Sequence, residues 1–176
     1  GTLNINAAGA LPSTSAVVNN ATLNFNNSSV NTAAGITGTG ATVISSGSTL
    51  KLTQTIGTTG SVTVSSGGVL DLNGQSSSSN LLISGTGTGA GALINSSATA
   101  GTQSGNLTLN GNTTIGGTGN ITISSVISGA FGLTKSGANT LTLSSANTYT
   151  AGTTISAGTL SISASNNIPS ANITIN

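Results

Sequence analysis

The 176-residue sequence contains no histidine, cysteine, methionine, tryptophan, arginine or glutamate, and only Lys51, Asp71 and Lys135 carry a charge. Without cysteine there is neither a disulfide framework nor thiol chemistry, and the usual transition-metal ligands are missing. One carboxylate cannot supply the pair that glycoside hydrolysis needs. A serine nucleophile would have no histidine as its base. We therefore expect no enzyme, no cofactor and no metal site.

The scarcity of charge also limits the partners of the chain. A net charge of +1 offers no electrostatic footprint for nucleic acid or for an anionic membrane surface. No apolar run is long enough to span a bilayer, so we expect no membrane insertion. Disordered chains are typically rich in charge and proline, whereas this one has neither. The composition therefore favours an ordered, uncharged fold.

What the sequence does contain is a regular alternation of Leu, Ile and Val with Ser, Thr, Asn and Gly, which is typical of short strands. The clearest internal repeat aligns positions 42–52 (TVISSGSTLKL) with positions 62–72 (VTVSSGGVLDL). In that register Lys51 and Asp71 form an outer-face charge pair on adjacent coils, since alternate side chains point to opposite faces. The inward positions predicted for the core are Leu50, Leu52, Leu70 and Leu72.

Residues 126–162 (VISGAFGLTKSGANTLTLSSANTYTAGTTISAGTLSI) comprise four short strands separated by turn-forming residues. None can bury a face alone, so such units gain stability by stacking on copies of themselves. The predicted core positions here are Leu141, Leu143, Leu160 and Ile162.

The elements GLTKSG, LTLS, ANTYT, GTT and GTL occur in order in this stretch, which strongly resembles the autotransporter-associated β-strand repeat of secreted bacterial passenger regions. The chain departs from that pattern at Ala151-Gly152 and at Ala138-Asn139. The resemblance implies a right-handed parallel β-helix, exported and displayed outside the cell, and it implies no catalytic residues.

Repeat spacings of about 20 residues, a length typical of solenoid coils, predict an all-β fold: a single parallel β-helix (β-solenoid) of eight or nine coils, which the resemblance implies to be right-handed. At about 4.8 Å per coil the rod would be about 40 Å long. We follow one inward face through Leu3, Leu23, Val62, Leu107, Ile121, Leu141 and Leu160. Residues 76–104 are of low complexity, and SGTGTGAG within them is interpreted as a corner or loop, because a phosphate-binding loop would need a following helix.

The last segment of the sequence repeats the first. Residues 158–176 align without gaps to residues 1–19 with eight identities. We interpret residues 1–176 as one continuous solenoid segment: a 157-residue higher-order repeat plus the start of the next. Open end coils invite pairing with another chain, so we expect head-to-tail continuation through the terminal coils, as a longer chain or as stacked copies.

The function expected from these patterns is structural: a segment of an extracellular fibre, stalk or filament, at a bacterial surface or secreted. An alternative is an adhesin-type passenger that binds a host surface or a glycan. Its only candidate recognition loop, residues 76–91, has neither aromatic nor charged side chains. A remote alternative is an ice-binding solenoid, suggested by threonine pairs such as Thr140/Thr142, although they do not complete a lattice.

Overall fold

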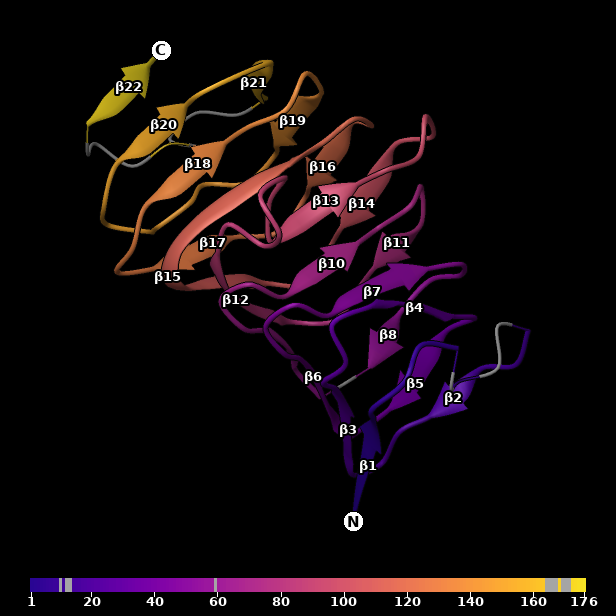
Figure 1. Ribbon diagram of the computed structural model, residues 1–176. Coiled ribbons are helices and arrows are strands. Elements are labelled where there is room, and N and C mark those ends of the chain that lie inside the picture. The colour runs from indigo at the N-terminus through magenta and orange to yellow at the C-terminus, as the bar shows by residue number, and fades with distance from the viewer. Residues whose placement is uncertain (10, 12–13, 59, 164–167, 169–171) are drawn as a thin grey trace.

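The computed structural model describes residues 1–9, 11, 14–58, 60–163, 168 and 172–176, in which strands are the only regular elements. The strands are short because turn-forming residues interrupt the apolar alternation every few residues. All named strand pairs are parallel, and they stack from the N-terminal to the C-terminal end (Figure 1). No described element is a helix, and so none has the length and hydropathy of a membrane span.

Each coil has three faces, which we call face a, face b and face c in the order in which the chain meets them. Face a contains β1 (Thr2–Ile5), β3 (Thr22–Phe25), β6 (Ala41–Ile44), β9 (Val62–Val64), β12 (Leu81–Gly85), the first part of β15 (Leu107–Gly117) and β17 (Ile127–Gly129).

Face b follows face a in the chain. It contains β4 (Val30–Ala33), β7 (Thr49–Leu52), β10 (Val69–Asp71), β13 (Leu93–Asn95), the second part of β15, β18 (Leu133–Lys135), β20 (Thr153–Ile155) and β22 (Ile173–Ile175). The 11-residue β15 runs around the corner between the two faces, and it joins them into one 14-stranded sheet.

Face c closes each coil. It contains β2 (Val17–Val18), β5 (Ile36–Gly38), β8 (Gly57–Thr58), β11 (Ser76–Ser77), β14 (Gly101–Gln103), β16 (Ile121–Ile123), β19 (Thr140–Leu143) and β21 (Thr159–Ile162). An isolated bridge between Ile56 and Ser77 connects its first three strands with the other five.

The register confirms the predicted coil of about 20 residues and gives about eight turns. Leu3 pairs with Leu23, and Leu133 pairs with Thr153, each one such period later. The irregularity expected near residues 80–110 is a set of longer coils: on face c, Ser77 pairs with Gln103, a wider separation in sequence. The additional residues lie in the loop of residues 86–91, between β12 and β13, and in the next corner, between β13 and β14.

One expectation about the faces is wrong. Leu3, Leu23, Val62 and Leu107 lie on face a, but the remaining members of the predicted inward face lie on face c, where Ile121 pairs with Leu141 and Leu141 with Leu160. Both faces carry inward aliphatic residues at the same spacing of one coil, so spacing alone does not separate them.

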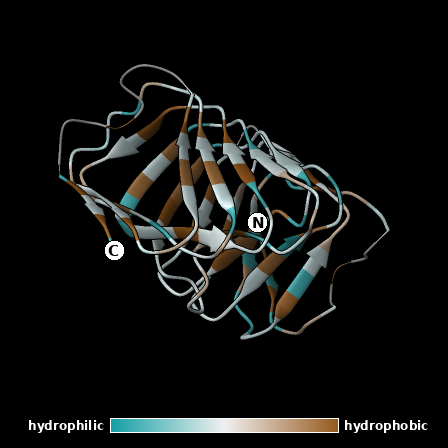
Figure 2. Ribbon diagram, turned by 90° about the horizontal axis from the view of Figure 1, so that it is seen from above, coloured by the Kyte–Doolittle hydropathy of each residue, from teal (hydrophilic) through white to brown (hydrophobic). Residues whose placement is uncertain are grey.

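The core is a column of aliphatic side chains along the axis. Inward positions of successive coils stack directly on one another because the parallel strands are in register. Banding of hydrophobic and paler residues along the strands is visible in Figure 2. Of the predicted core positions, Leu50, Leu52, Leu70, Leu72, Leu141 and Leu143 are fully buried, and Leu160 is partly buried against them. Phe25 is also fully buried.

Ile162 is a correction to the predicted core. Its side chain is 49% exposed although it faces the same interior as Leu143, its partner in β19. No described strand pairs with the other edge of β21, so nothing among the described residues covers Ile162 from that side.

Candidate functional site

The pair Lys51 and Asp71 lies on face b, where β7 and β10 bring the two residues into register. Lys51 Nζ is 3.9 Å from Asp71 Oδ2. The Lys51 side chain is 35% exposed, whereas that of Asp71 is only 5% exposed. The expectation that both charges lie at the surface is therefore wrong for Asp71, because the chain of the next coil folds over its carboxylate.

Asp71 has closer partners than Lys51. Its Oδ1 accepts hydrogen bonds from the backbone N–H groups of Asn73 and Ser96, each at 3.0 Å, and its Oδ2 accepts one from Ser96 Oγ at 2.6 Å. Hydrogen bonds to a charged group contribute about 1.5–3 kcal/mol each, whereas an ion pair at 3.9 Å whose ammonium partner is partly exposed contributes under about 1 kcal/mol. Asp71 therefore anchors two corners of the solenoid, and Lys51 adds little.

Lys135 is the second polar site, and it lies inside the solenoid. The residue is fully buried in the inward column of face b, between Ile115 and Ile155. Its stem replaces an aliphatic side chain, and its ammonium reaches a corner where it donates to oxygen acceptors of two coils: the carbonyls of Ser136, Gly137 and Ala157, and Asn139 Oδ1. Burial lowers the pKa of Lys135 below its ordinary value.

Tyr149 and Asn147 complete this region on face a. Tyr149 is fully buried, and its hydroxyl shares a hydrogen bond of 2.5 Å with Thr153 Oγ1. Burial raises the pKa of Tyr149, and the hydrogen bond with Thr153 partly opposes that shift. Asn147 Oδ1 accepts the backbone N–H of Ile127 at 2.7 Å. These polar residues fix the backbone of neighbouring coils.

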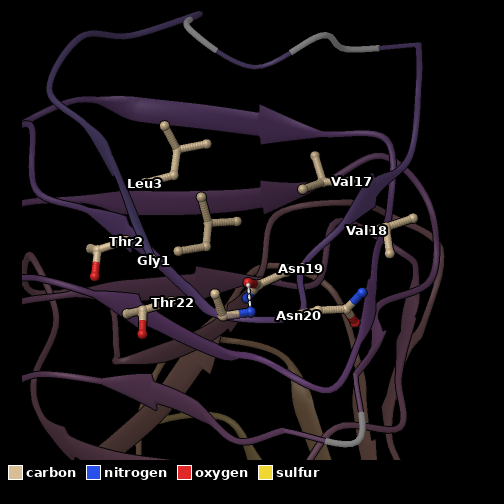
Figure 3. Close-up of a pocket in the computed structure, with 10 residues that line it drawn as sticks. Gly1, Thr2, Leu3, Val17, Val18, Asn19, Asn20 and Thr22 are labelled. Atoms are coloured by element: carbon tan, nitrogen blue, oxygen red, sulfur yellow. Dashed lines mark hydrogen bonds between the residues drawn. The ribbon is translucent and has the colours of Figure 1, made fainter.

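The N-terminal end of the solenoid is an open apolar surface. Leu3 and Val18 are 52% and 69% exposed. Together with Val17 and Leu23 they line a cavity of about 340 Å³ (Figure 3). Asn19 borders this cavity, where its Oδ1 accepts the backbone N–H of Ala21 at 3.1 Å. Because β1 pairs only with β3 among the described strands, its other edge is free. We call this surface, formed by β1 and β2, the N-terminal end face.

The C-terminal end shows the same features. Ile173 and Ile175 of β22 on face b are 52% and 75% exposed, and Ile162 of β21 on face c is 49% exposed. Among the described strands, β21 pairs only with β19, and β22 only with β20. We call this surface, formed by β21 and β22, the C-terminal end face. Both end faces thus combine free strand edges with apolar side chains that continue the core column, namely Leu3 and Val17 at one end and Ile173 and Ile175 at the other, whereas Val18 points outward in register with the exposed Thr37.

The outer surface of face c is uncharged and regular over four coils. A half-buried column of hydroxyl side chains runs parallel to a more exposed serine column. The first column consists of Thr102, Thr122, Thr142 and Ser161, and the second of Ser104, Ser124, Ser144 and Ser163. A third, less regular column contains Asn120, Thr140 and Thr159. On face b, Thr134, Thr154 and Thr174 line a groove of about 310 Å³.

Reasoning from sequence did not identify Lys135 or Tyr149 as interior residues. The signal was present for the lysine: Lys135 occupies the next inward position after Leu133, and it lies one coil before Ile155 on the same face. Lysine is rarely buried without a charged partner, so the residue type favoured an exposed side chain even though the position pointed inward.

Comparison with known proteins gave one match. The family model described as the passenger-associated-transport-repeat matches residues 133–162, which are β18 to β21 and the turns between them. No curated protein and no solved structure matches the chain. The match and the solenoid fold both fit a repeat of the autotransporter-associated type at these residues.

Proposed function

Since residues 133–162 form a passenger-associated transport repeat within a parallel β-solenoid, we propose that this chain is a structural segment of an exported bacterial passenger, at the cell surface or secreted. In this role the rod continues head-to-tail through its end faces, as part of a fibre, stalk or filament. The observation that carries the proposal is the pair of end faces, each with a free parallel edge and an exposed apolar core.

The physical argument is that an uncovered end is costly. Burial of apolar surface is worth about 25 cal/mol per Å², and free strand edges readily pair with another strand. The described N-terminal end face has no charged side chain that would oppose such pairing. A further parallel coil would cover Leu3 and Val17 at one end and Ile173 and Ile175 at the other.

Solution scattering on the 176-residue chain tests this proposal. We expect the rod to lengthen with protein concentration while its cross-section stays constant, because a heterologous contact that does not close produces filaments. The double variants Leu3→Lys/Val17→Lys and Ile173→Lys/Ile175→Lys should abolish growth. Val126→Lys is the matched control, since Val126 is 37% exposed and lies between the ends, where its carbonyl accepts the N–H of Leu107. A monodisperse monomer at high concentration would contradict the proposal.

The coil that covers an end could belong to a longer polypeptide or to a second copy, and the chemistry is the same in both cases. Denaturing electrophoresis of the native material distinguishes them. Stacked copies would separate to 16.6 kDa, whereas a continuous chain would remain large.

Face c supports a second candidate function, binding to an ordered, neutral surface such as ice. Its hydroxyl columns repeat at the coil spacing of about 4.8 Å, and Thr122 and Thr142 occupy the middle of this array. Thermal hysteresis of the purified chain tests the idea, and Thr122→Lys/Thr142→Lys should abolish it while Thr134→Lys on face b leaves it unchanged. Freezing behaviour equal to that of a control protein would rule this candidate out.

A further inference from the structure

Strand β1 at the N-terminal end face and strand β21 near the C-terminal end have nearly the same sequence. Residues 1–5 read GTLNI and residues 158–162 read GTLSI. In both strands the two apolar residues face the interior: Leu3 and Ile5 pair with Leu23 and Phe25, and Leu160 and Ile162 with Leu141 and Leu143. The equivalence therefore extends from sequence to side-chain orientation.

The backbone groups agree as well. The carbonyls of Gly1 and Ile5 accept hydrogen bonds from the next coil, at Thr22 and Asn26. Because alternate peptide groups of a strand point to opposite edges, the amides of Thr2 and Asn4 lie on the free edge of β1. In β21 the residue equivalent to Thr2 is Thr159, whose N–H donates to the carbonyl of Asn139 in the coil below at 3.2 Å.

The edge of β21 that corresponds to the free edge of β1 is paired with a preceding strand. That strand is β19, whose Leu141 and Leu143 lie under Leu160 and Ile162. This inference rests on the proposed head-to-tail function. We propose that a coil with the sequence of residues 139–157, from another copy of this repeat, packs on the N-terminal end face. Its equivalents of Leu141 and Leu143 lie under Leu3 and Ile5, and its equivalent of Asn139 accepts the N–H of Thr2.

The assignment has a geometric consequence, because β1 lies on face a whereas β21 lies on face c. The higher-order period, from Gly1 to Gly158, is therefore not a whole number of coils, but seven coils and two further faces. Successive copies are rotated about the axis by two thirds of a turn in the winding direction, which equals one third of a turn in the opposite sense. This inference rests on β1 alone. The alignment of residues 1–19 with residues 158–176 also matches β2 with β22, which likewise lie one face apart. In that alignment, however, the inward-facing positions of β2 and β22 are shifted by one residue relative to each other.

The test extends the full chain at its N-terminus by a copy of residues 126–157, so that Ala157 of the copy precedes Gly1. We expect the amides of Thr2 and Asn4 to exchange hydrogen at least 100-fold more slowly than in the unextended chain. The matched control carries Leu141→Lys and Leu143→Lys in the added copy, and should leave exchange unchanged. Equal exchange in the extended and unextended chains would overturn the proposal.

Cysteine cross-linking tests the rotation separately, and the absence of native cysteine makes the assay clean. Thr142 pairs with Ser161, and Asn4 is the equivalent of Ser161. In the extended chain Asn4→Cys should therefore cross-link with Thr142→Cys of the added copy, and not with its Thr134→Cys. Cross-linking to both positions alike would overturn the assignment. If scattering shows end-to-end growth while these assays fail, head-to-tail stacking stands and only the identity of the coil is wrong.

Discussion

Single residues act here mainly by satisfying backbone groups inside a chain that has almost no charge. Asp71 accepts three hydrogen bonds from two corners, and the Lys135 ammonium meets four oxygen atoms from two coils. Asn27 and Asn31 pair reciprocally through their side-chain amides, at 2.8 and 2.9 Å. At corners, where strand ladders are interrupted, such side chains replace the missing backbone partners.

The two members of the Lys51–Asp71 pair should differ in their effect on stability. Asp71→Ala removes the acceptor of three part-buried hydrogen bonds, from the N–H of Asn73 and from the N–H and hydroxyl of the exposed Ser96, so we expect a loss of about 1–3 kcal/mol. Lys51→Ala should cost under about 1 kcal/mol, because Lys51 lies 3.9 Å from Asp71 and is partly exposed. Denaturant unfolding of both variants measures the difference, and equal losses would contradict the assignment of Asp71 as the anchor.

Lys135 should make stability depend on pH in the alkaline range. Its pKa is lowered in the folded chain, so between that value and about 10.5 the unfolded chain binds more protons, and the free energy of unfolding rises with pH. Tyr149 has the opposite effect: its pKa is raised, and its contribution is lost as the pH rises through the folded value. Tyr149→Phe isolates the lysine.

In the Tyr149→Phe variant, urea unfolding from pH 7 to 10.5 should show that the free energy of unfolding rises with pH. Adding Lys135→Met should abolish it, and adding Lys51→Met should not. A rise that persists without Lys135 would show that another group titrates.

At the scale of elements, the fold follows from strands that are too short to be stable alone. In the 14-stranded sheet most strands have two parallel neighbours about one coil away in sequence, and β15 binds faces a and b together. Glycine is essential where two backbones approach closely at a corner. Gly129 has φ of 120°, and a Cβ at this position would clash with the carbonyl oxygen of Leu109.

Gly129→Ala should therefore destabilise the chain strongly, by about 3 kcal/mol or more, since both backbone strain and a steric clash oppose it. Gly89→Ala is the matched control: its φ of 113° is similar, but no atom lies within 4 Å of the added Cβ. The control should show only the cost of the backbone conformation, on the order of 1 kcal/mol. Thermal unfolding distinguishes the two variants, and equal shifts would show that the clash is relieved.

The sequence predicted elements well where coils are regular. Four of the strands of residues 126–162, the length of the coil and most core leucines follow from alternation and offset alone, whereas β17 (Ile127–Gly129) is not among the four strands predicted there. Assignment to faces failed for Ile121 and Leu141, because all three faces carry inward aliphatic residues at the same period. Burial of Asp71 and Lys135 also escaped prediction, since it depends on corners supplied by Ser96 and Ala157, which are 25 and 22 residues away in sequence.

At the scale of the whole molecule, the parallel ladder of strands contains both bonds that trypsin could cleave. Trypsin can cut only after Lys51 and Lys135, and both lie within strands, the second fully buried. We expect the native chain to resist trypsin for hours, with Lys51 cleaved before Lys135, because cleavage requires local opening of the ladder. Mass spectrometry of timed digests measures this order, and rapid initial cleavage at Lys135 would contradict burial of its side chain.

The stacking of short coils has a mechanical consequence. The backbone hydrogen bonds between coils run along the axis of the rod. Tension applied to the two ends therefore breaks the hydrogen bonds of one coil at a time rather than those of all coils together. A regular coil releases roughly 70 Å of chain when it peels away, and the longer coil between Ser77 and Gln103 roughly 90 Å. The rod would then yield in small, nearly equal steps, extending many times its length before its last coil opens.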